Sequence, residues 1–463
     1  MVFSSILFLF VFLPLLLIYY LAPFRFKNFV IMILSFVFYS WGEPKYFFIM
    51  IFTILINYVL AIILENNINN KIISKLVLST AVLFNLGELF FFKYYNFFIE
   101  NINYITGLKI SFLRFTLPLG ISFYIFQILS YVIDVYRNKI KAEKNIVDFS
   151  AFVVLFPQLI AGPIVKYTDI NKELKYREIT LDKIQDGIRL FILGLGKKVL
   201  IANNVGCLWS EIENIGLENI SFVLAWLGLI AFAIQIYFDF SGYSLMAIGL
   251  GKMLGFEFPK NFDFPYISKS VTEFWRRWHI TLSSWFKEYL YIPLGGNRCS
   301  NWRRTFNLFI VWFSTGFWHG ANWNFIFWGL FFFLLLTIEK IKFKKFCLLD
   351  FLNRHKIFSH IYLLFIILIS WALFAVDDIN KLKIFIFNLF NFNFKLDWVY
   401  YLKNYFIILI LSIILSTPLI FNFYNKKIKS NIFLDTIVLI ILLILSVAYL
   451  VDATYNPFLY FRF

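Results

Sequence analysis

The chain has 463 residues, of which 61% are hydrophobic and 15% are charged, and its mean hydropathy is +0.76. Such a composition excludes an ordinary soluble domain and indicates a membrane protein. The net charge of +16 could indicate a nucleic-acid partner, but the basic residues lie in loops between apolar stretches. We therefore expect cytoplasmic loops that face anionic membrane lipids, and no nucleic-acid partner.

The first apolar segment, residues 2–21, has no basic residues before it and no small-residue cleavage site, so we expect a retained anchor. Further apolar segments follow at residues 30–41, 46–64, 76–92, 117–136, 146–165, 188–208, 220–240, 243–254, 306–317, 325–338, 357–374, 405–419 and 432–450. Residues 30–41 and 243–254 are too short to span a bilayer alone, and we expect tilted, re-entrant or broken helices there. The pattern predicts an all-α polytopic membrane protein with a single transmembrane domain over residues 1–463.

Charges in the loops indicate the orientation of the segments. Arg25 and Lys27 follow the first segment, which places the N-terminus outside. Residues 210–219 contain three glutamates and no basic residue, as expected of an outer loop, whereas residues 426–429 contain three lysines and fit an inner loop. The last segment then delivers the C-terminus to the outside as well.

Lys197 and Lys198 allow two interpretations. If a span begins at residue 188, the two lysines lie deep in the bilayer and need partners. If residues 181–196 form an amphipathic surface helix, the lysines lie at the interface and reach toward water. We favour the surface helix. Asp239 lies between two apolar segments and needs a hydrogen-bonding environment, so it could orient a histidine or close a helix turn.

The largest inner stretch is residues 257–304, in which the pattern predicts one interfacial or re-entrant helix. Ser270 and Glu273 have the spacing of a capping box at its start, and Pro293 ends it. The helical period places four side chains on one face: Trp275, His279, Leu282 and Phe286.

Basic side chains gather on the cytoplasmic side of this stretch: Arg276, Arg277, Lys287, Arg298, Arg303 and Arg304. An anionic ligand such as a nucleotide-bearing cofactor would suit them. Contact with lipid head groups is the alternative, and composition alone favours it.

Residues 306–338 form two apolar arms around the sequence Trp318 to Asn322, with basic residues beyond both ends. Both ends therefore belong on the cytoplasmic side. The first arm, up to His319, has 14 residues. A helix of that length rises about 21 Å, less than the ~30 Å of the hydrocarbon core. We therefore expect His319 inside the membrane plane, where an ionisable side chain is a candidate for function.

Two roles fit His319 on this evidence. It could be a hydrogen-bonding group that holds two short helices together, or a catalytic base. A neutral imidazole can take a proton from an attacking hydroxyl, and burial keeps the ring neutral. His279 has the same alternatives, because its aromatic face suits packing equally well. The four histidines and three cysteines show no metal-ligand spacing and no disulfide framework, so we expect no metal.

Several stretches in order resemble the membrane-bound O-acyltransferase family, in its alginate and peptidoglycan O-acetyltransferase branch: residues 85–98, 117–124, 156–164, 237–243, 274–296, 316–323 and 456–463. The resemblance implies a ring of transmembrane helices with re-entrant helices around a central tunnel. It maps the near-invariant histidine of the family onto His319 and a second, more variable polar position onto His279. Asp239, Trp318 and Asn322 would support this site.

The resemblance also implies an enzyme of the bacterial inner (cytoplasmic) membrane. Acetyl-CoA would be the donor substrate rather than a permanently bound cofactor, and the candidates to bind it are Arg276, Arg277, Lys287 and Arg298. The acetyl group would reach a glycan outside the membrane, peptidoglycan or an alginate-like polysaccharide, through a secreted, esterase-like partner transferase of the SGNH type. The alternatives are a D-alanyl transferase for teichoic acids and, in another class, a transporter or flippase. We see no half-to-half repeat, which many transporters carry.

Overall fold

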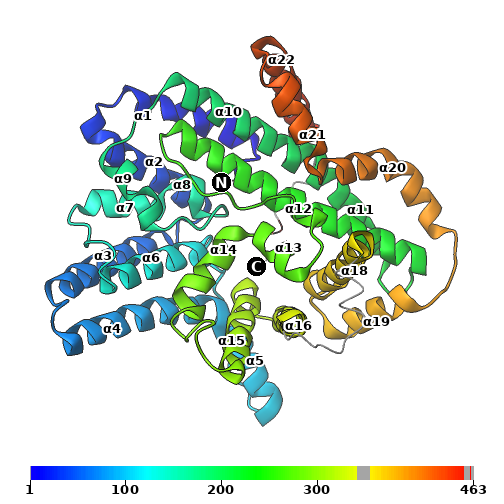
Figure 1. Cartoon of the computed structure of the whole chain (residues 1–463), viewed down its shortest axis with the longest axis horizontal. Helices are drawn as coiled ribbons and strands as arrows, with labels where there is room; N and C mark the ends of the chain where they lie inside the picture. The colour runs from blue at the N-terminus through cyan, green and yellow to red at the C-terminus, as the bar shows by residue number, and fades with distance from the viewer. Residues whose placement is uncertain (1, 341–354, 453–458, 460–463) are drawn as a thin grey trace. The chain divides into compact units, whose positions relative to one another are not determined.

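A computed structural model describes residues 2–340, 355–452 and 459 of the chain (Figure 1). Within these ranges every regular element is helical, and seven helices are long and apolar enough to cross a membrane. The prediction of an all-α polytopic membrane protein is therefore confirmed. Cys347 and most of the motif at 456–463 lie outside the described residues.

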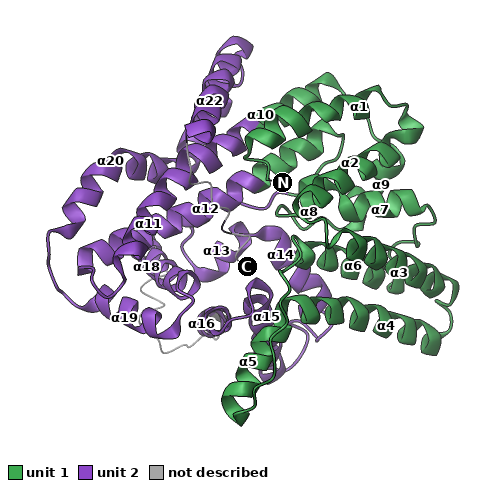
Figure 2. Cartoon of the chain, turned by 180° about the vertical axis from the view of Figure 1, so that it is seen from behind, with its two compact units in different colours: residues 1–191, 244–259 green, residues 192–243, 260–463 purple. Residues whose placement is uncertain are grey.

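The chain divides into two compact units (Figure 2). Unit 1 comprises Met1–Phe191 and Ser244–Pro259, and unit 2 comprises Ile192–Tyr243 and Lys260–Phe463. The single domain over residues 1–463 stays a prediction. One long helix, α12 (Phe222–Met253), begins in unit 2 and ends in unit 1.

The α-helices of unit 1 are α1 (Leu16–Leu21), α2 (Lys27–Gly42), α3 (Phe47–Asn66), α4 (Lys71–Leu89), α5 (Tyr95–Thr106), α6 (Ile121–Tyr136), α7 (Ile146–Val154), α8 (Phe156–Leu159), α9 (Tyr167–Lys175) and most of α10 (Leu181–Gly196). Several polar groups inside its apolar helices are paired. The carboxylate of Glu88 accepts hydrogen bonds from the hydroxyls of Thr53 (2.8 Å) and Tyr124 (2.9 Å). The amides of Asn57 and Asn85 bond to each other. Such pairing is required where water is absent.

Unit 2 contains the π-helical η5 (Lys197–Asn203), α11 (Asn204–Ile215), α13 (Val271–Arg277), α14 (Ile280–Phe286), η7 (Lys287–Tyr291), α15 (Asn301–His319), α16 (Trp323–Lys340), α18 (Lys356–Ala375), α19 (Ile379–Phe390), α20 (Asp397–Leu415), α21 (Pro418–Phe423), η8 (Tyr424–Ile428) and α22 (Ile432–Asp452). Its buried core is rich in tryptophan and phenylalanine, drawn mainly from α12, α13, α15, α16 and α18.

The prediction of two separate apolar segments at 220–240 and 243–254 is wrong, because α12 runs through both without a break. Gly242, which lies between the two predicted segments, serves close packing. A Cβ at this position would lie 2.8 Å from the carbonyl oxygen of Gly194. The glycine is thus required by the approach of a neighbouring backbone and not by a turn.

Helices α15 and α16 form the hairpin predicted around Trp318 to Asn322 and lie side by side (Figure 1). The two backbones touch where two glycines face each other: a Cβ at Gly316 would overlap the carbonyl oxygen of Phe325, and a Cβ at Gly329 would overlap that of Trp312. Small residues at such a crossing let two helices pack at minimal distance, which is a common device inside membranes. This crossing fixes where α15 ends relative to α16.

Replacement of Gly329 by alanine should therefore lower the free energy of unfolding by about 1–3 kcal/mol, because a methyl group must displace the backbone of α15. Gly87, in α4, provides the matched control. Nothing lies within 4 Å of a Cβ at this position, so Gly87→Ala should be neutral or stabilising by up to about 1 kcal/mol. Thermal unfolding of both variants in detergent measures the difference, and equal midpoints would contradict the packing described.

Candidate active site

His319 is the last residue of α15 and is 4% exposed. Its ring is surrounded by aromatic rings from three helices. The centroid distances are 5.1 Å to Trp318, 5.0 Å to Trp328 on α16 and 5.3 Å to Phe374 on α18, each in an edge-to-face arrangement. Three aromatic rings thus pack directly against the imidazole.

The loop after His319 is anchored to the end of α18. Gly320 has no room for a side chain, because a Cβ would overlap the ring of Phe325. The amide of Asn322 donates to the backbone oxygen of Asp377 (3.3 Å), and that of Asn324 donates to the backbone oxygen of Phe374 (3.4 Å). Asn322, which we predicted to support the site, thus holds the loop in which the helix hairpin turns.

His279 lies between α13 and α14, and the single helix predicted over this stretch is therefore wrong. His279 has left-handed backbone angles (φ 42°, ψ 54°) and is fully buried. Asn261 supports the break: its side-chain oxygen accepts from the backbone N–H and the hydroxyl of Thr281, and its backbone oxygen accepts from Ile280. One asparagine thus provides acceptors for groups that a continuous helix would have paired.

The two histidines are connected through Trp318. The ring of Trp318 lies 5.1 Å from that of His319 and 6.0 Å from that of His279. His279 also packs on Phe240 of α12 at 4.7 Å, and its Nδ1 lies 3.1 Å from the side-chain oxygen of Asn261. The structure therefore brings together His279, Trp318 and His319.

Asp239 has a different partner from the histidine that we considered. Its Oδ1 pairs with the amine of Lys198 at 2.7 Å, and its Oδ2 accepts the backbone N–H of Leu459 at 2.9 Å. Lys198 is 1% exposed and also donates to Asn203. The surface-helix interpretation of Lys198 is therefore wrong. The lysine lies deep because a carboxylate on the neighbouring helix compensates its charge.

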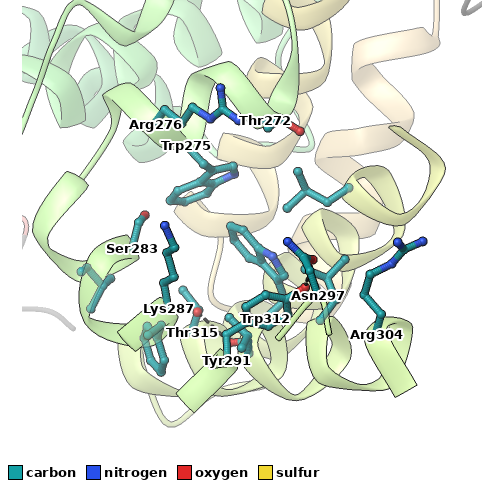
Figure 3. A pocket seen from close by; sticks show the side chains of 15 residues that line it. Thr272, Trp275, Arg276, Ser283, Lys287, Tyr291, Asn297, Arg304, Trp312 and Thr315 are labelled. Atoms are coloured by element: carbon teal, nitrogen blue, oxygen red, sulfur yellow. Dashed lines mark hydrogen bonds between the residues drawn. The ribbon is translucent and has the colours of Figure 1, made fainter. Parts of the chain in front are cut away.

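A pocket of about 700 Å³ lies between α13, α14, η7, α15 and α16 (Figure 3). It is lined by Thr272, Trp275, Arg276, Leu282, Ser283, Phe286, Lys287, Tyr291, Asn297, Arg304, Leu308, Val311, Trp312, Thr315 and Leu336. Polar and basic groups lie on α13, η7 and the start of α15, whereas tryptophans, phenylalanine and leucines form the rest of the wall. The pocket therefore suits a ligand with an anionic part and a largely uncharged part.

One face of α15 leads from this pocket to His319. Arg304, Leu308, Val311 or Trp312, and Thr315 follow each other at helical spacing along the pocket wall. His319 is the next position on the same face, one turn beyond Thr315, which is about 6 Å along the helix axis. The pocket stops before it, because the rings of Trp275 and Trp312 are in contact (4.7 Å) and Trp328 packs behind them (5.6 Å from Trp275).

The structure separates the predicted donor-binding residues into two groups. Arg276 and Lys287 line the pocket. Arg277 instead forms ion pairs with Glu273 and Asp263, and Arg298 is exposed and outside the pocket lining.

Arg304 also lines the pocket, although we had grouped it only with the basic side chains of this region. The sequence feature that could have identified Arg304 is its position about four helical turns before His319. No carboxylate is among the lining residues, so the three cations form a positive field that attracts an anion.

Comparisons with known proteins show the family to which the chain belongs. A model of the MBOAT, membrane-bound O-acyltransferase family matches residues 139–376. The chain is 44% identical over 345 residues to the probable alginate O-acetylase of Azotobacter vinelandii, covering 73% of this chain and 69% of that protein. It is 36% identical over 381 residues to the peptidoglycan O-acetyltransferase of Helicobacter pylori, covering 73% and 70%.

A teichoic acid D-alanyltransferase of Streptococcus thermophilus is 28% identical over 248 residues, which cover 49% of this chain and 58% of that protein. The range 139–376 contains both buried histidines and every residue that lines the pocket. The candidate site thus lies inside the part of the chain that matches the family.

The buried ion pair generates a prediction on stability. Lys198→Met alone leaves the Asp239 carboxylate buried without its cation and should cost about 3–5 kcal/mol. Asp239→Asn keeps an oxygen for the N–H of Leu459 but removes the charge that compensates Lys198, so its cost should be similar. The double variant should lose less than the sum of the two. Thermal unfolding of the four proteins gives the coupling energy, and simple additivity would show that the pair contributes nothing.

Proposed function

Because the chain belongs to the membrane-bound O-acyltransferase family and is an O-acyltransferase, we propose that it transfers acetyl groups from acetyl-CoA to an acceptor on the other side of the membrane. The observation that supports this most is the face of α15, which joins a basic pocket to a buried histidine. Relatives named as O-acetyl transfer enzymes support the acetyl group.

The pocket matches coenzyme A in chemistry. Coenzyme A has a phosphate-bearing nucleotide head and an uncharged arm that ends in the thioester. Arg276, Lys287 and Arg304 would hold the phosphates, since guanidinium and ammonium groups bind them strongly. Trp275 and Trp312 would contact the arm. The basic residues near the start of α15 support a cytoplasmic position of this mouth in the proposal, on the side where acetyl-CoA is made.

His319 acts as the general base in this proposal. An acceptor hydroxyl arrives from the outer side, and the imidazole takes its proton as the oxygen attacks the thioester carbon. The new C–O bond forms, the C–S bond breaks, and the thiolate of coenzyme A takes the proton back from His319. General-base assistance of this kind contributes roughly 10²–10⁴-fold. Fixing the thioester in the pocket would supply much of the rest.

The acceptor in this proposal is a glycan outside the membrane, either peptidoglycan or an alginate-like polysaccharide, because the relatives named above act on these two. A secreted, esterase-like transferase would receive the acetyl group and place it on the sugar. The second candidate function, D-alanyl transfer to teichoic acid, is supported by the relative at 28% identity.

The deciding experiment compares wild type with His319→Ala at matched expression in the native host. Ester-linked acetate is measured in purified cell-wall and exopolysaccharide fractions, and ester-linked D-alanine in teichoic acid. We expect acetate to fall by at least 10²-fold in one fraction, because the base is lost. Unchanged acetate in every fraction would contradict the proposal, and a fall in D-alanine alone would select the second candidate.

The basic pocket gives a prediction on substrate affinity. Arg276→Gln and Arg304→Gln should each raise KM for acetyl-CoA about tenfold, because each removes one charge-assisted bond to the ligand. Arg298→Gln removes the same charge from an exposed position outside the pocket and serves as the control. Initial rates in membrane preparations at varied acetyl-CoA measure the effect. An equal KM in all three variants would place donor binding elsewhere.

A further inference from the structure

The buried indole N–H groups of Trp275 and Trp328, both in unit 2, have no hydrogen-bond acceptor within the part of the chain that the structure describes. Two tryptophans elsewhere in this unit are paired: Trp226 donates to the backbone oxygen of Leu389 (2.9 Å), and Trp371 donates to the hydroxyl of Tyr266 (3.2 Å). A buried donor without an acceptor destabilises a fold, and each such group calls for an explanation.

Both groups lie on the line from the pocket to His319. Trp275 lines the pocket, and Figure 3 shows its ring between Arg276 and Trp312. Trp328 packs against Trp275, with ring centroids 5.6 Å apart, and its own ring lies 5.0 Å from that of His319. Trp275 is 7% exposed and Trp328 is 1% exposed. The two donor groups thus lie between the pocket and His319: Trp275 borders the pocket, and Trp328 lies next to both Trp275 and His319.

A thioester of coenzyme A brings the acceptors that these groups lack. Its arm carries amide carbonyl oxygens, and its reacting end carries the thioester carbonyl. When a hydroxyl attacks that carbon, the carbonyl oxygen gains negative charge. A fixed N–H in a site without water stabilises such an oxygen far better than it stabilises the uncharged ground state.

We propose that the Nε1–H of Trp328 donates to the thioester oxygen as it becomes an oxyanion, and that the Nε1–H of Trp275 binds an amide oxygen of the arm. The inference rests on the proposed function, in which His319 is the base. The proton of the hydroxyl goes to His319 and then to the departing thiolate. Trp328 keeps its own proton throughout and donates only a hydrogen bond.

The test replaces one nitrogen in each ring. Substitution of Trp328 by β-(3-benzothienyl)alanine keeps the bicyclic ring and puts sulfur in place of N–H. Membranes of the native host, which contain the acceptor, are supplied with labelled acetyl-CoA, and ester-linked acetate is measured. We expect kcat to fall by about 10²–10³-fold, the range for one oxyanion donor, with KM nearly unchanged. The same replacement at Trp275 should raise KM about tenfold and leave kcat nearly unchanged, because its partner is the same in ground and transition states.

Trp226 provides the matched control, since it is a half-buried tryptophan whose N–H has a protein acceptor. Its benzothienyl variant should turn over like wild type. Thermal midpoints of the Trp275 and Trp328 variants should not fall, because an unpaired donor has been removed. Trp328→Phe, which also lacks the N–H, gives a second route to the same answer.

A Trp328 variant with wild-type kcat would overturn the inference while leaving the role of His319 intact. A His319→Ala protein that still transfers acetyl groups would instead remove the proposed function itself. The two failures are therefore distinguishable in one set of assays.

Discussion

The site depends on the contact of two helix backbones at Gly316 and Gly329. Because neither position has a Cβ, α15 and α16 approach closely enough for the aromatic rings of α16 to reach the end of α15. That contact fixes His319 against Trp328 and Phe374. The position of His319 is thus fixed by the packing of α15 on α16 and by the turn at Gly320.

Polar chemistry around this site follows one rule, that a charge or a hydrogen-bonding group inside the membrane must find a partner. Lys198 and Asp239 satisfy it with each other, and Asn261 satisfies it for the break at His279. The indole N–H groups of Trp275 and Trp328 have no partner in the described residues, and they lie beside the pocket and the histidine. The proposal above gives these two groups a ligand as their partner.

The sequence allowed the helical class and the hairpin to be predicted, because hydropathy, glycines and flanking charges are local signals. The depth of His319 in the membrane stays a prediction. The sequence did not allow the break at His279 to be predicted, since Trp275, Leu282 and Phe286 fit a continuous helix equally well. The break depends on Asn261, which lies outside that pattern. Lys198 was misplaced for the same reason: its partner is on another helix, and single-sequence periodicity contains no pairing information. The role of Arg304 in the pocket lining could be recognised from its helical spacing only after the structure had shown the pocket.

The pairing of Lys198 with Asp239 has a consequence for biogenesis. The lysine is synthesised first, and the carboxylate follows on the next long apolar helix, so the charge of Lys198 is compensated only once that second helix is present. The second bond of the carboxylate joins it to a backbone N–H 220 residues later in the chain. Until Leu459 has been synthesised, Oδ2 of Asp239 lacks this hydrogen-bond donor. The ion pair can therefore form before the hydrogen bond to Leu459, which completes the partners of Asp239 only at the end of synthesis.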